Sequence, residues 1–184
     1  MNIRKLKKRN AKNQYEHRVN RKYKDSLFRK IFSDRKDLLD LYNALNDTQY
    51  TDEEELTVTT LEDVIYVSIK NDVSFLLGGT MNLYEHQSSY NPNMPIRGLI
   101  YFARLYQNYI DECEINVFSP VLKHLPRPKF IVFYNGSKDE PDQKLLRLTD
   151  AFTETGESGE SCLECCATML NINYGHNYEL MEKC

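Results

Sequence analysis

The sequence of 184 residues contains no apolar run approaching the roughly 20 residues that a bilayer crossing requires. Its basic N-terminus has no apolar stretch behind the charges, so it does not read as a secretion signal. The five cysteines are an odd number, and four of them lie close to the C-terminus, which does not suit a secreted disulfide framework. We therefore expect a cytoplasmic protein with reduced thiols and no membrane partner.

The chain also lacks the glycine motifs of several enzyme classes. There is no GxxxxGK[ST] phosphate loop, no GxGxxG dinucleotide turn and no GxSxG nucleophile elbow. Nucleotide-driven and serine-hydrolase chemistry are therefore unsupported. The composition, with 41% hydrophobic and 28% charged residues and no internal repeat, is that of one globular domain.

Charge is distributed very unevenly along the chain. Residues 1–24 hold ten of the 24 Lys and Arg residues but only one of the 27 acids, for a formal charge of +9, which leaves −12 on the remaining 160 residues. We divide the chain into a basic N-terminal arm, residues 1–23, and a domain, residues 24–184, that is expected to be incomplete at its C-terminus. The positive charge of the arm suits phosphate binding. A chain terminus that is simply exposed to solvent explains this charge equally well.

The pattern of apolar and turn residues predicts a mixed α/β domain. Helical spacing favours one broken helix or two helices, whereas runs rich in β-branched and aromatic residues favour strands joined by a tight hairpin. The nearly continuous apolar run KFIVFYNG is typical of a central strand buried on both faces. The predicted helices cover residues 24–46 and 93–110, and the predicted strands cover 57–70, 71–77, 80–89, 129–136 and 162–173; a polar loop and a Gly/Ser/Glu-rich segment, 153–161, separate the last two.

The helix predicted over residues 93–110 has two distinct faces. One side is apolar: it carries Ile96, Ile100, Ala103 and Ile110, and it is widened by Leu99, Phe102, Tyr106 and Tyr109. Arg97, Tyr101 and Arg104 lie on the other side, so that two guanidiniums and an aromatic ring share one polar stripe.

The hairpin brings two acids together. If Gly78-Gly79 is a two-residue turn, Asp72 lies directly opposite Glu85, with Lys70 and Gln87 on the same face. Opposed like charges are destabilising unless a cation is shared, and Mg²⁺ usually combines one or two carboxylates with waters and a substrate phosphate. The alternative is that both acids belong to the solvated face of a hairpin, neutralised by Lys70.

At these residues the chain resembles a known nuclease pattern. Asp72, a short hairpin and then Glu85-His86-Gln87 look like the PD-(D/E)XK core in the variant that ends in glutamine. The strings YKDSLFRKIF, LYEHQSSYNPNMPIRGLIYFARLY, FIVFYNG and LNINYGHNYELME resemble the Rpn family of recombination-promoting nucleases, or putative transposases, over roughly residues 22–184. This resemblance implies a restriction-endonuclease-like core, with a mixed central sheet flanked by helices.

The resemblance also implies roles for individual residues. Asp72 and Glu85 would bind Mg²⁺, Gln87 would stand where the family usually has a lysine, and Asp25 would be an acid supplied by the first helix. Asp25 also suits the N-cap of that helix. Because glutamine carries no charge, we expect Lys70 to supply the missing cation, with a plain surface lysine as the alternative.

Other residues complete the expected site and its alternatives. Arg97 is expected to hold the scissile phosphate, with a surface arginine as the alternative, and Arg104 to assist in binding DNA. His86 points away from the acids by strand parity. The cysteines near the C-terminus include one CxxC without a second pair, so buried thiols on a strand are favoured over zinc.

The sequence thus predicts a Mg²⁺-dependent endodeoxyribonuclease, associated with recombination or mobile elements, whose partner is DNA. Hydrolysis would proceed by attack of water, without a covalent intermediate. The alternative is a non-catalytic DNA- or protein-binding remnant of such a nuclease. A homodimer is a further partner that the sequence leaves open.

Overall fold

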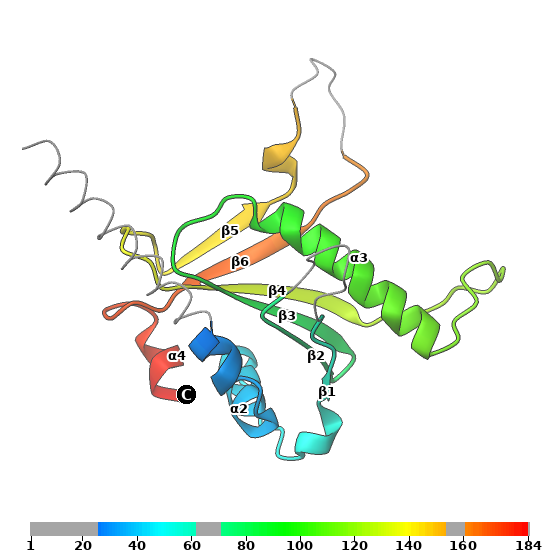
Figure 1. Ribbon diagram of the computed structural model, residues 1–184, viewed down its shortest axis with the longest axis horizontal. Helices are drawn as coiled ribbons and strands as arrows, with labels where there is room; N and C mark the ends of the chain where they lie inside the picture. Colours follow the sequence, from blue (N-terminus) through cyan, green and yellow to red (C-terminus); the bar gives the residue numbers. More distant parts are fainter. Residues whose placement is uncertain (1–25, 62–70, 154–160, 184) are drawn as a thin grey trace, which may run out of the picture.

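The computed structural model describes residues 26–61, 71–153 and 161–183. A six-stranded mixed sheet with the strand order β1-β2-β3-β4-β6-β5 forms its centre, and helices flank it (Figure 1). The predicted fold class is confirmed, since this architecture is consistent with a restriction-endonuclease-like core. The strands are β1 (Thr57–Val58), β2 (Val73–Leu77), β3 (Thr80–Gln87), β4 (Arg127–Tyr134), β5 (Gln143–Arg147) and β6 (Cys166–Asn171), and the helices are α2 (Arg35–Asn46), α3 (Met94–Glu112) and α4 (Tyr178–Lys183).

The β2–β3 hairpin has the predicted register. Leu77 pairs with Thr80 and Ser74 pairs with Leu83, so only Gly78 and Gly79 lie in the turn. Their φ angles of 56° and 74° are left-handed, which glycine adopts without steric cost and which two-residue hairpin turns require. The turn therefore fixes which residues of β2 and β3 face each other.

Beyond β3 the sheet becomes parallel. Helix α3 crosses over from β3 to β4, which pairs parallel with both β3 and β6, and β5 returns antiparallel to β6. As predicted from its apolar run, β4 is an interior strand, and its last five residues are buried. The parallel strands β3, β4 and β6 end at the same edge of the sheet.

Two hydrophobic cores, one on each face of the sheet, join it to the helices. One core combines Phe28, which lies in a helical segment over residues 26–31, with α2 residues such as Leu38 and with Phe133 of β4. The other core combines Met94 and Leu105 of α3 with sheet residues. Alternate residues of each strand supply the two cores, as the pleat of a strand requires.

Three predictions about elements were wrong in whole or in part. The apolar side of α3 is only partly buried: Phe102 lies in the core, whereas Ile96 and Ile100 are 38% and 47% exposed, and Tyr101 on the predicted polar stripe is buried. The polar segment that we took for a loop contains β5, an edge strand with one buried residue. Of the cysteines expected to be buried, Cys162 and Cys166 are exposed and Cys165 is partly buried.

Several predictions fall on residues outside the described ranges. These are the basic arm, most of the strand expected over residues 57–70, and the two site candidates Asp25 and Lys70. Among the described residues, no helix combines the length and apolar character needed to span a membrane.

Candidate active site

The site is built at the open end of the β2–β3 hairpin, one residue beyond the last ladder pair. Val73 pairs with Tyr84, so continuing the register places Asp72 opposite Glu85. The Asp72 N–H donates to Oε1 of Glu85 at 3.0 Å, and the His86 N–H donates to Oδ2 of Asp72 at 2.8 Å. Each carboxylate thus reaches the backbone beside the other, and the predicted meeting of the two acids is confirmed.

The pair is shielded from water, which excludes the alternative of a solvated hairpin face. The side chain of Glu85 is 1% exposed and that of Asp72 is 14% exposed. Burial raises the pKa of Glu85 to about 8, and the negative charge of Asp72 adds to the rise, while Arg97 and the Asp72 N–H oppose it. A buried carboxylate beside a second acid requires positive charge nearby.

Two arginines supply positive charge. Nη2 of Arg97 lies 2.5 Å from Oε2 of Glu85, and Nε of Arg29 lies 3.4 Å from Oδ1 of Asp72. Arg97 belongs to the first turn of α3, whereas Arg29 belongs to the helical segment 26–31, so each layer of helices contributes one guanidinium. The Tyr101 hydroxyl also accepts from Nε and Nη2 of Arg97, which fixes the guanidinium against the acid.

The remaining candidates are placed differently. Gln87 is two residues beyond Glu85 at the end of β3, half-buried, and strand alternation puts it on the same face as Glu85. Arg104 is exposed and donates to Gln107, so the structure does not bring it to the acids. Arg29 was missed in the sequence analysis, because no local pattern relates it to Asp72.

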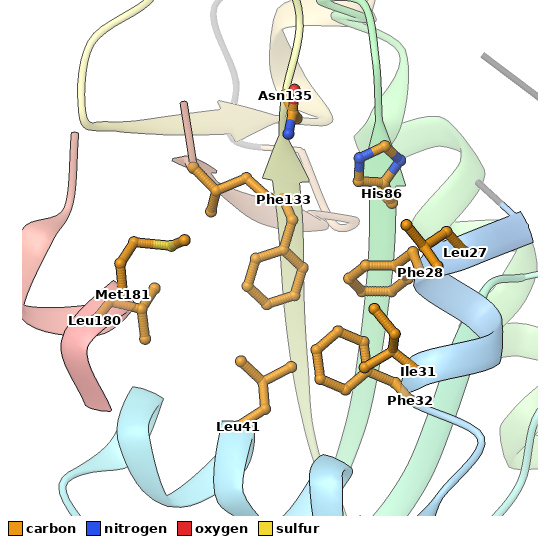
Figure 2. A pocket seen from close by; sticks show the side chains of 11 residues that line it. Leu27, Phe28, Ile31, Phe32, Leu41, His86, Phe133, Asn135, Leu180 and Met181 are labelled. Atoms are coloured by element: carbon orange, nitrogen blue, oxygen red, sulfur yellow. The ribbon is translucent and has the colours of Figure 1, made fainter. Parts of the chain in front are cut away.

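His86 faces the opposite core, as predicted from strand parity. Its ring stacks on Phe28 with the ring centroids 5.5 Å apart. Figure 2 shows it with Asn135 at one end of a cavity of about 270 Å³, which is otherwise lined by apolar side chains from residues 26–32, α2, β4 and α4. Such walls offer little to stabilise a phosphate, so this cavity is a poor candidate for phosphodiester chemistry.

The acidic pair supplies two ligands toward a metal site. Within residues 26–61, 71–153 and 161–183, no three His, Cys, Asp or Glu side chains gather to hold an ion. With the described residues alone, further ligands would be water, backbone carbonyls or a substrate, which is the donor set typical of Mg²⁺.

Comparisons with models of protein families, with curated proteins and with solved structures gave no match.

Proposed function

We propose that the protein is a Mg²⁺-dependent endodeoxyribonuclease of the PD-(D/E)XK type, similar to the Rpn family and acting in the cytoplasm in recombination or on mobile elements. The observation that carries this proposal is the acidic pair. Asp72 and Glu85 lie side by side at the open end of a hairpin, where Glu85 has only 1% of its side chain exposed. Gln87 follows at the spacing of the ExQ variant.

The acidic pair fits Mg²⁺ on chemical grounds. Its two carboxylates are hard oxygen donors, and the pKa of Glu85 is raised first by burial and then by the charge of Asp72, a charge that a bound cation would offset. When bound there, Mg²⁺ would lower the pKa of a coordinated water and offset negative charge on the phosphate. Asp72 and Glu85 are the residues that would hold it.

The protein's own groups then have definable tasks in the proposed reaction. Arg97 binds a non-bridging phosphate oxygen through its guanidinium fork, and the Gln87 amide orients the attacking water. The attacking water gives a proton to solvent and its oxygen forms a bond to phosphorus as the bond to the leaving oxygen breaks, and the leaving oxygen takes a proton from solvent. Lys70 and Asp25 stay candidates from the sequence for charge stabilisation and for a third acid.

DNA is proposed as the substrate because the charge of the chain is arranged for a polyanion. The acidic body would repel DNA in general, whereas residues 1–24, with a formal charge of +9, would attract it. In the candidate site itself, Arg29 and Arg97 are 36% and 33% exposed, so both guanidiniums can be approached from solvent.

Cleavage of supercoiled plasmid tests this proposal. We expect the wild-type protein to nick the plasmid with Mg²⁺ and not with EDTA, and Asp72→Asn to lose about 100-fold or more of that activity, because a metal ligand is removed. Asp40→Asn is the matched control, since Asp40 is an exposed acid on α2. Equal nicking by the two folded variants would reject the proposal.

One observation favours the second candidate, a non-catalytic DNA- or protein-binding remnant. The two arginines already neutralise the acids, as they would in a purely structural ion network. This candidate predicts salt-sensitive DNA binding without cleavage, and binding that survives Asp72→Asn. A gel-shift titration beside the nicking assay separates the two functions.

A further inference from the structure

The carboxylate oxygens of the acidic pair are all engaged by donors of the protein. Oε1 of Glu85 accepts from the Asp72 N–H, and Oδ2 of Asp72 accepts from the His86 N–H. The other two oxygens face guanidiniums, with Arg97 2.5 Å from Oε2 of Glu85 and Arg29 3.4 Å from Oδ1 of Asp72. Two of these four donors are side-chain guanidiniums and two are backbone N–H groups.

A divalent cation and the guanidiniums therefore compete for the same two oxygens. Two positive charges at one carboxylate repel each other strongly where water is excluded, and the Glu85 side chain is almost fully buried. A cation binds most tightly between the acids if the guanidiniums can form their ion pairs with another negative partner. A phosphate group of DNA is such a partner.

Arg97 has capacity for that exchange. Within the part of the chain that the structure describes, its Nη1 faces only the thioether sulfur of Met94, at 3.4 Å, which is a weak acceptor. Its Nε and Nη2 share the Tyr101 hydroxyl, which keeps the guanidinium near the acids even when Glu85 is released. Arg29 approaches the other acid from the opposite helical layer, so the two guanidiniums flank the pair.

We propose that Arg29 and Arg97 together form the receptor for the scissile phosphate, and that in the free protein the acidic pair occupies this receptor. The inference rests on the proposed nuclease function and deepens it by adding Arg29 and an exchange of partners. DNA phosphate replaces Asp72 and Glu85 as the partner of the guanidiniums, and the freed carboxylates bind the metal. Metal and DNA each strengthen the binding of the other by the same factor, as linkage requires.

Calorimetric titration with Ca²⁺ as the metal probe tests the coupling. We expect a short DNA duplex, confirmed intact by gel, to tighten Ca²⁺ binding by about 5- to 150-fold, the usual range for coupled sites. Arg97→Gln should bind Ca²⁺ more tightly than wild type without DNA, and DNA should then tighten it little further. Arg29→Gln should likewise raise the Ca²⁺ affinity of the free protein and reduce the further tightening by DNA.

Arg35→Gln is the control, because Arg35 is an exposed arginine that pairs with Glu54 and contacts neither acid. It should keep the free-protein Ca²⁺ affinity and the coupling of wild type. Unchanged Ca²⁺ affinity on adding DNA to wild type, or equal Ca²⁺ affinities of the free Arg97→Gln and Arg35→Gln proteins, overturns the inference.

Asp72→Asn distinguishes failure of this inference from failure of the proposed function. Loss of Ca²⁺ binding in Asp72→Asn, combined with no coupling in wild type, leaves the metal site standing and rejects only the exchange. Retention of wild-type Ca²⁺ binding in Asp72→Asn rejects the metal site, and the exchange with it.

Discussion

Glu85 shows how opposing effects are balanced at one residue. Burial and the neighbouring Asp72 both favour its neutral form, and Arg97 and a backbone N–H favour its charged form. Removing only one member of such a buried network typically costs several kcal/mol, because a charge is left without its partner. The acidic pair should therefore tolerate replacement of a guanidinium by another cation better than removal of that guanidinium without a replacement.

Cys165 is a second residue whose surroundings determine its chemistry. Burial raises its pKa to about 11, and the nearby Cys166 and Glu164 add to the rise. Since the thiolate is the nucleophile, Cys165 should react with iodoacetamide at pH 8 about 100-fold more slowly than an ordinary exposed cysteine. Its rate should keep rising with pH toward 11, whereas an ordinary thiol levels off above about 8.5.

Mass spectrometry of peptides after timed alkylation measures these rates. Cys162 and Cys166 serve as internal references, because both are exposed, and fragmentation distinguishes Cys166 from its neighbour. Alkylation of Cys165 as fast as that of Cys162 at pH 8 would contradict the expected pKa.

At the scale of elements, the docking of α3 on the sheet positions Arg97. Gly98 is buried and adjacent to Arg97, and a Cβ there would lie 2.5 Å from Cε1 of Phe130 on β4 and 3.2 Å from Sγ of Cys165. The glycine therefore allows close approach of the helix to β4. A larger residue would force α3 outward and carry Arg97 away from Glu85.

Gly98→Ala should lower the free energy of unfolding by about 1–3 kcal/mol, because overpacking outweighs the better helix propensity of alanine. Asn108→Ala, at an exposed position of the same helix, is the control and should be close to neutral. Urea denaturation of both variants measures the difference. A Gly98→Ala protein as stable as the control would show that the helix is not tightly docked.

Local chemistry explains which elements were predictable from the sequence. Gly78 and Gly79 determine the turn type, the turn type determines the register, and the register places Asp72 opposite Glu85. The buried face of α3 was predicted only in part, because apolar residues occur on most of its circumference and the docked face is selected by the small Gly98 and by the pairing of Arg97 with Glu85.

Contacts between distant elements were not predictable in the same way. Arg29 meets Asp72 only because the helical segment 26–31 packs across the opposite face of the sheet. Strand β5 was missed because it is a polar edge strand, and such a strand needs to bury little to pair with β6.

In the whole molecule, β3 joins two halves of different construction. It pairs antiparallel with β2 through a two-residue turn and parallel with β4 through the long α3 crossover. The acidic pair lies on the local side of this division, while Arg97 comes from the crossover. The contact between Asp72 and Glu85 spans 13 residues and that between Arg97 and Glu85 spans 12, but Arg97 also depends on the docking of α3 against more distant residues such as Phe130 of β4.

This division has a consequence for the order of folding. Closing a short hairpin costs less entropy than closing a long crossover, so β2 and β3 should pair early and α3 should dock late. Gly79→Ala strains a residue at φ 74° with no neighbour within 4 Å, and should cost about 1–2 kcal/mol, seen mainly as slower refolding.

Gly98→Ala should instead mainly speed unfolding, since its contacts form after the rate-limiting step. Stopped-flow kinetics of the two variants measures both rates, and a Gly79→Ala protein with an unchanged refolding rate would contradict this order. On this route Asp72 and Glu85 come together in a nascent hairpin while the chain is still largely open. Their mutual repulsion then opposes the earliest step of folding until the first arginine arrives.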